Sequence, residues 1–366
     1  MTPHSHASSN LTSHTFGDNS LRIDIEAHER GVNLTWTDRR TGYTVGPTPM
    51  LELELHEKPI RRNLRVPEYT VHRLEPAENG AHVVVGDTQR QIVAGLWVHV
   101  IDGELVVRVP IPEVYERLDG VWRLFAVDIL PDLMSIDAAG TLMLPVGCGA
   151  LCRPADKPAL RDDMLLYMEQ PRWDIAPILP LCAAWDDDHG IIAMATDGDC
   201  DTRCSVETDG RGHGRTSFAV TLRRVWHDPV DTQTRELRYR PSHLDAAMDV
   251  PHQAGHRLRR VMIDRRGMRP LADRRRDNPA IDYVLQSHIM KMSFAQENVG
   301  WEMMSKDKSD PVTYQLEMTF AEAELALRRL REAGIEKVQT FACGWNARGH
   351  DGLYPTRFPI DERLGG

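Results

Sequence analysis

Residues 335–352, IEKVQTFACGWNARGHDG, place a strand-like segment directly before a loop of glycines and polar side chains. Residues 335–342 predict a short buried strand because they are rich in β-branched and aromatic residues. The loop, residues 344–352, follows the carboxyl end of that strand, which faces the ligand crevice in α/β folds. This stretch therefore predicts an α/β region whose loop binds a ligand.

Four side chains of this loop are predicted to bind a polyhydroxylated substrate. Trp345 offers an aromatic face for a sugar ring, and Asn346, His350 and Asp351 offer hydrogen-bonding groups for hydroxyls. Two alternatives remain open: Trp345 as an anchor between domains, and Asp351 as a carboxylate that only fixes the loop. A direct relay between His350 and Asp351 is not expected, because adjacent residues of an extended loop point in different directions.

Helical and strand patterns alternate upstream of this loop. They are a short helix at residues 280–285, strands at 287–294 and 312–318, and a helix that opens with the capping box of Thr319 and Glu322 and closes at Gly334. This order is typical of a parallel α/β fold. A complete (β/α)8 barrel takes about 250 residues. We therefore expect residues 280–366 to be the first β/α units of an incomplete TIM barrel, in a truncated chain.

Earlier in the chain, short segments alternate between apolar and polar residues. The segments are residues 21–25, 51–55, 82–85, 96–101, 105–109, 142–144, 191–195 and 217–222. Asp102-Gly103 between two of them is a hairpin signal. We expect a large antiparallel β-sandwich over residues 21–256, after a disordered N-terminus at 1–20. The arginine-rich residues 257–279 predict a linker with a solvated face.

Composition excludes several classes of protein. The formal net charge of −10 argues against a general nucleic-acid binder. No apolar run reaches the about twenty residues of a membrane helix, and residues 1–20 are polar, so we expect no membrane partner and a cytoplasmic location. No phosphate-binding or dinucleotide glycine motif occurs. We therefore expect no cofactor, although the sequence is compatible with a structural divalent cation.

The six cysteines are interpreted as reduced thiols. Cys148 and Cys152 are four residues apart, as are Cys200 and Cys204, so a zinc site of four thiolates is an alternative. The spacing is wider than that of zinc knuckles, and no histidine at ligand spacing accompanies the pairs. Zinc is therefore the weaker interpretation.

The run from Gly344 to Pro355, with its Gly-Trp-Asn start, its Gly-His-Asp-Gly and its Tyr-Pro, resembles a group of glycosidases. The group comprises the α-N-acetylgalactosaminidases of glycoside hydrolase family 129 and the related endo-acting enzymes of family 101. Residues 122–131 and 144–151 are similar to the N-terminal sandwich of the same proteins. The resemblance covers most of the chain.

This resemblance implies a galactose-mutarotase-like β-sandwich followed by a (β/α)8 barrel. It implies retaining hydrolysis of an α-linked N-acetylgalactosamine or a related sugar by an aspartate nucleophile and a glutamate acid/base. It also implies that Asp351 hydrogen-bonds sugar hydroxyls and that Trp345 walls the subsite. The two catalytic carboxyls lie on later strands in the family, so they are expected downstream of Gly366, and the catalytic residues of this chain are unknown.

The chain is therefore expected to be an N-terminal fragment, inactive alone, whose partners are a carbohydrate substrate and the missing C-terminal half of the barrel. A second hypothesis is a carbohydrate-binding or accessory protein that uses the β-sandwich without catalysis. A third is a mutarotase-like epimerase, which needs a histidine and a carboxylate together in the sandwich. Sequence spacing does not reveal such a pair.

Overall fold

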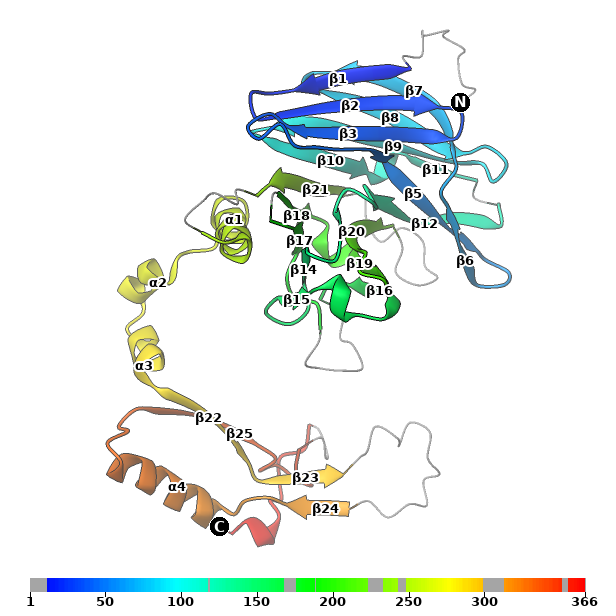
Figure 1. Ribbon diagram of the computed structural model, residues 1–366. Helices are drawn as coiled ribbons and strands as arrows, with labels where there is room; N and C mark the ends of the chain where they lie inside the picture. The colour runs from blue at the N-terminus through cyan, green and yellow to red at the C-terminus, as the bar shows by residue number, and fades with distance from the viewer. Residues whose placement is uncertain are drawn as a thin grey trace. The chain divides into compact units, whose positions relative to one another are not determined.

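The computed structural model describes residues 12–117, 119–167, 176–187, 189–222, 233–242, 248–298, 313–350 and 355–365. The chain divides into two compact units between Arg266 and Gly267, a boundary that falls inside the predicted linker. Each unit is described by itself (Figure 1). Within these residues, no helix is both long enough and apolar enough to cross a membrane.

The first unit consists mainly of antiparallel strands in three sheets. One sheet has the order β1-β2-β3-β4, with strands β1 Ser13–Gly17, β2 Leu21–His28, β3 Gly31–Asp38 and β4 Thr44–Pro49.

The largest sheet has the order β15-β14-β17-β18-β21-β10-β9-β8-β7, and β11 pairs with β9. Its strands are β7 Thr70–Ala77, β8 Gly80–Asp87, β9 Ile92–Ile101, β10 Glu104–Pro110, β11 Val114–Glu116, β14 Thr141–Leu144, β15 Ala150–Cys152, β17 Leu181–Trp185, β18 Gly190–Asp197 and β21 Thr234–Pro241.

The third sheet has the order β16-β19-β20-β12-β5-β6, and β13 pairs with β20. Its strands are β5 Leu51–Glu57, β6 Arg62–Val66, β12 Trp122–Ile129, β13 Ser135–Ile136, β16 Ala159–Leu165, β19 Thr202–Asp209 and β20 Gly214–Thr221.

The strands form where the sequence alternates. In β2, Leu21, Ile23 and Ile25 are buried, while Arg22 and Glu26 between and after them are exposed. This period of two places one apolar face of a strand against the core. All eight predicted strand segments coincide with strands of the structure, and the turn at Asp102-Gly103 joins the antiparallel pair β9 and β10. The prediction of a β-sandwich-rich antiparallel fold is thus confirmed at the level of its strands.

The N-terminal region differs from the prediction. Residues 1–20 were expected to be disordered. Residues 1–11 lie outside the described residues, but Ser13–Gly17 form β1, which pairs with β2 along its whole length. Phe16 is 8% exposed and belongs to the apolar core of the unit. The polar composition of the segment was misleading, because an edge strand needs only one apolar anchor when its backbone hydrogen bonds are satisfied by a neighbour.

Helices occupy much of the predicted linker. Helix α1, Val250–Asp264, is capped by Asp249, whose carboxylate accepts a hydrogen bond from the His252 N–H. Short helix α2, Leu271–Asp277, follows in the second unit. The expectation of a solvated arginine face was wrong at Arg257, which is 4% exposed. Its guanidinium pairs with Glu104 on β10 and donates to the Ile192 carbonyl on β18.

The second unit contains both helices and strands. Its further elements are α3 Ala280–Gln286, β22 His288–Ser293, β23 Ala295–Asn298, β24 Thr313–Leu316, α4 Phe320–Glu332 and β25 Val338–Cys343. β22 and β25 are parallel, whereas β23 and β24 are antiparallel. The predicted capping box starts α4, because Thr319 and Glu322 satisfy each other's free backbone N–H groups. Gly334, at φ +86°, follows its end as predicted.

A carboxyl group is buried within the third sheet of the first unit. Asp128 on β12 is 5% exposed and lies opposite Glu52 of β5. Burial raises the pKa of Asp128 to about 6, and a hydrogen bond from Ser217 only partly opposes this effect. The folded state therefore binds a proton at Asp128 more tightly than the unfolded state does.

Asp128→Asn is expected to change how stability depends on pH. Since the folded pKa is raised, the contribution of Asp128 to stability is full below its ordinary pKa of 3.8 and is lost as pH rises through about 6. The gap corresponds to about 3 kcal/mol. Urea unfolding of both proteins should show the stability of the variant rising relative to the wild type by about that amount between pH 3 and pH 7.5. A difference that stays constant with pH would contradict the buried, proton-binding state.

Candidate functional site

The loop after β25 is held over the segment that follows β22. The His350 N–H donates to the Ala295 carbonyl at 2.8 Å, and His350 forms a parallel bridge with Gln296. On the other side, the Ala347 N–H donates to the Arg357 carbonyl at 3.0 Å. The loop therefore lies at the carboxyl ends of two parallel strands, which is the edge where α/β folds bind ligands.

Two glycines make this close approach possible. Gly344 has φ +72° and Gly349 has φ +80°, both in the left-handed region. A Cβ atom on Gly344 would lie 2.0 Å from the Ala295 carbonyl oxygen, and one on Gly349 would lie 2.8 Å from it. Both positions therefore require glycine for space as well as for conformation.

Three of the four predicted binding residues lie in this loop as described. Trp345 is partly buried, packs beside the cluster of Phe294 and Leu364, and meets Phe358 edge-on, with ring centroids 6.4 Å apart. His350 is also partly buried. Asp351 lies outside the described residues.

Asn346 makes its hydrogen bonds within the loop itself. It is 6% exposed, and its Nδ2 donates to the Gly349 carbonyl at 2.8 Å. The Gly349 N–H in turn donates to the Asn346 carbonyl at 2.9 Å. This amide therefore ties the loop to itself, a role that its position in the sequence did not reveal.

The cysteine pairs do not converge on a metal site. Cys148 and Cys200 are exposed, whereas Cys152 and Cys204 are buried in the sandwich core. Among the residues that the structure describes, no group of three or more His, Cys, Asp or Glu side chains is placed to hold a metal ion. The zinc alternative therefore has no geometric support there.

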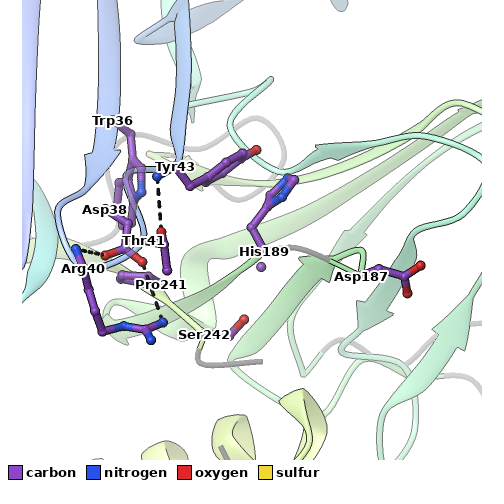
Figure 2. A pocket seen from close by; sticks show the side chains of 10 residues that line it. Trp36, Asp38, Arg40, Thr41, Tyr43, Asp187, His189, Pro241 and Ser242 are labelled. Atoms are coloured by element: carbon purple, nitrogen blue, oxygen red, sulfur yellow. Dashed lines mark hydrogen bonds and ion pairs between the residues drawn. The ribbon is translucent and has the colours of Figure 1, made fainter. Parts of the chain in front are cut away.

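Sequence reasoning missed a second polar site, in the first unit. His189 Nε2 lies 3.0 Å from Asp186 Oδ2, and its ring stacks on Tyr43 with centroids 3.5 Å apart (Figure 2). The epimerase hypothesis requires a histidine and a carboxylate in a cleft of the sandwich, whereas this pair lies in the turn between β17 and β18, where the Asp186 N–H also donates to the His189 carbonyl. The pair is local in sequence, but its aromatic neighbour is not, and no spacing rule connects them.

Comparison with known proteins yields matches at the level of structure. No family model matches the chain, and no curated protein sequence matches it. A solved structure of the α-N-acetylgalactosaminidase NagBb from Bifidobacterium bifidum in complex with GalNAc is similar, with a TM-score of 0.69 and 16% sequence identity. The match covers 96% of this chain and 55% of that chain.

Two other structures of NagBb agree with this result. The complex with Gal-NHAc-DNJ has a TM-score of 0.68 at 17% identity, and the ligand-free form has 0.66 at 17% identity. This chain spans about half the length of NagBb, since each match covers 55% of the NagBb chain. Identity this low shows a shared fold alone. This chain therefore shares the fold of slightly more than half of the NagBb chain.

Proposed function

We propose that this chain is part of a retaining α-glycosidase that hydrolyses α-linked N-acetylgalactosamine or a related sugar. The observation that carries the proposal is the structural match over 96% of the chain to an α-N-acetylgalactosaminidase solved with GalNAc. The resemblance of residues 344–355 to the same group of enzymes supports it from the sequence.

The exposed face of the second unit supports an incomplete barrel. Met290 and Met292 of β22 pack with Ala323 of α4. On the opposite face of the parallel pair, Ile289 is 70% exposed and Phe341 is 67% exposed. In a (β/α)8 barrel, helices cover one face of the strands and the other face fills the interior. We infer that further β/α units, outside this chain, cover Ile289 and Phe341.

The loop would then supply part of a sugar site. Trp345 would stack on the sugar, and His350 and Asp351 would hydrogen-bond its hydroxyls. Asn346 would act by holding the loop, because its amide is already bonded to the Gly349 carbonyl. The aspartate nucleophile and the glutamate acid/base would come from the further units, as a retaining mechanism requires two carboxyls about 5 to 5.5 Å apart.

The test compares this chain alone with the same chain continued through whatever coding sequence follows Gly366. Each is assayed for release of the aryl group from an aryl α-N-acetylgalactosaminide. We expect activity from the continued protein and none from the 366-residue chain. Activity of the shorter chain would contradict the assignment of the catalytic carboxyls elsewhere. Inactivity of both, with folding verified by circular dichroism, would contradict the glycosidase proposal.

A further inference from the structure

Helix α1 has one side packed on the sandwich and the opposite side exposed to solvent. The packed side consists of apolar residues that lie against β17 and β18 (Figure 1): Val250, Ala254, Leu258 and Val261. The exposed side consists of basic and small residues: His252, Gly255, His256, Arg259 and Arg260. The helical period of 3.6 residues separates the two sets. The exposed side therefore takes no part in holding α1 on the sandwich.

A hollow of about 340 Å³ lies on this exposed side. It is lined by Pro251, His252, Gly255, His256 and Arg259, which follow one another at helical spacing. Because Gly255 has no side chain, the surface of the helix is lowest there. From Pro251 to Arg259 the helix rises about 12 Å, which is close to the diameter of about 10–12 Å of a second helix.

Gly255 is not required by the fold of the first unit. It lies inside α1, in the ordinary right-handed conformation that any residue adopts in a helix. A Cβ atom at this position would meet no heavy atom within 4 Å. Glycine is less favourable than alanine inside a helix because it loses more backbone entropy. The remaining physical use of a glycine here is to let another backbone approach the helix closely.

The charge on α1 shows which kind of partner fits. Residues 250–266 contain five arginines and one acidic residue, although the whole chain has a formal net charge of −10. Three of these arginines pair with carboxylates of the first unit: Arg257 with Glu104, Arg265 with Glu236 and Arg266 with Asp199. Arg259 and Arg260 are exposed and make no ion pair within the part of the chain that the structure describes. These two guanidinium groups can therefore receive carboxylates of a partner.

Other kinds of occupant fit this surface less well. A nucleic acid is held by several phosphate contacts and aromatic platforms, whereas the exposed side of α1 has two unpaired arginines and no Trp, Tyr or Phe. A membrane surface requires large apolar side chains, which the exposed side lacks. A symmetric dimer through α1 would bring two basic helices together. The surface therefore favours an acidic polypeptide.

We propose that the exposed side of α1 is a docking site for an acidic helix of a partner protein. The partner helix crosses α1 at Gly255, and its carboxylates pair with Arg259 and Arg260. The site does not involve the loop at residues 344–350 and does not rest on the proposed glycosidase activity.

The test is fluorescence anisotropy of a labelled peptide mixed with the full chain at low salt. The probe is a helical peptide of about 20 residues built from Glu and Ala, and the reference peptide has Lys in place of Glu. We expect the Glu/Ala peptide to bind saturably and more tightly than the Lys/Ala peptide. Its affinity should fall as salt is added, because the paired charges are exposed.

Gly255→Leu separates docking from folding. Leucine is a better helix former than glycine and its Cβ has open space, so the melting temperature should rise by about 1–3 °C. The same side chain fills the hollow, so affinity for the Glu/Ala peptide should fall about tenfold or more. The peptide has no large apolar residue that could gain from contact with the leucine.

Arg259→Met should lower the affinity about three- to tenfold and leave the melting temperature nearly unchanged. Arg274→Met is the matched control, because it removes the same charge from an exposed position on α2 and should bind like the wild type. Equal losses in these two variants would overturn the proposal, since the peptide would then respond only to the overall charge.

Three further results would overturn the proposal. The first is a Glu/Ala peptide that binds no more tightly than the Lys/Ala peptide. The second is an affinity that Gly255→Leu leaves unchanged. The third is tighter binding of a single-stranded oligonucleotide that Arg259→Met abolishes, because the surface would then bind phosphates. Sedimentation of the chain alone adds a check, since self-association that Gly255→Leu abolishes would assign the surface to a second copy instead.

Discussion

Gly344→Ala is expected to disrupt the loop after β25 and to weaken the parallel pairing of β22 with β25. The new Cβ would lie 2.0 Å from the Ala295 carbonyl oxygen, and that oxygen belongs to backbone that cannot rotate away. It also accepts the hydrogen bond from the His350 N–H. The positive φ of 72° adds about 1–2 kcal/mol of strain for any residue with a Cβ.

Gly334→Ala separates the two effects. Gly334 has φ +86°, but its added Cβ would meet nothing within 4 Å. This variant should therefore show the conformational strain alone, about 1–2 kcal/mol. Gly344→Ala should be destabilising by about 3 kcal/mol or more, because the backbone must move as well.

Hydrogen exchange of the full chain, read by mass spectrometry on peptides of β22, β25 and the loop, measures the difference. Protection there should fall more than about a hundredfold in Gly344→Ala, since about 1.4 kcal/mol corresponds to a factor of ten. Peptides of the sandwich serve as the internal reference. Equal effects of the two substitutions would show that the loop does not need the close contact with Ala295.

Arg257→Met is expected to release helix α1 from the sandwich. Arg257 is 4% exposed, its Nε lies 3.0 Å from Glu104 Oε1, and its Nη1 donates to the Ile192 carbonyl at 3.0 Å. Breaking a buried ion pair on one side is destabilising by about 3–5 kcal/mol. Glu104 keeps a contact with Arg238 at 3.3 Å, so we expect the lower end, about 3 kcal/mol.

Arg259→Met is the matched control, because it makes the same change two residues along α1 at an exposed position. It should alter stability by less than about 0.5 kcal/mol. Urea unfolding, together with hydrogen exchange of peptides within residues 250–264, distinguishes the two variants. Comparable losses in both would mean that the arginines act through the overall charge of the helix and not through the buried pair.

Local features of the fold could be predicted because their causes lie within a few residues. The alternation of Leu21, Ile23 and Ile25 predicted β2, and the capping box of Thr319 and Glu322 predicted the start of α4. Asp102-Gly103 predicted the hairpin of β9 and β10. Each of these signals depends only on residues within its own segment. The prediction therefore does not require the position of any distant part of the chain.

Features that depend on distant partners were predicted less well. The polar segment that contains β1 looked disordered because its hydrogen-bond partner, β2, is not part of the local pattern. Arg257 looked solvated because Glu104, which makes its burial tolerable, is far away in the sequence. The binding roles of Trp345, Asn346, His350 and Asp351 stay predictions, although the buried amide of Asn346 favours a positioning role for that residue.

The sequence by itself determined where strands, turns and the capped helix lie, and which loop carries an aromatic residue among glycines. Only the tertiary structure decided that Arg257 is buried and that Gly344 lies against Ala295. The physical reason is that periodicity and capping act between neighbours along the chain. Burial and steric contact arise between segments that only folding brings together.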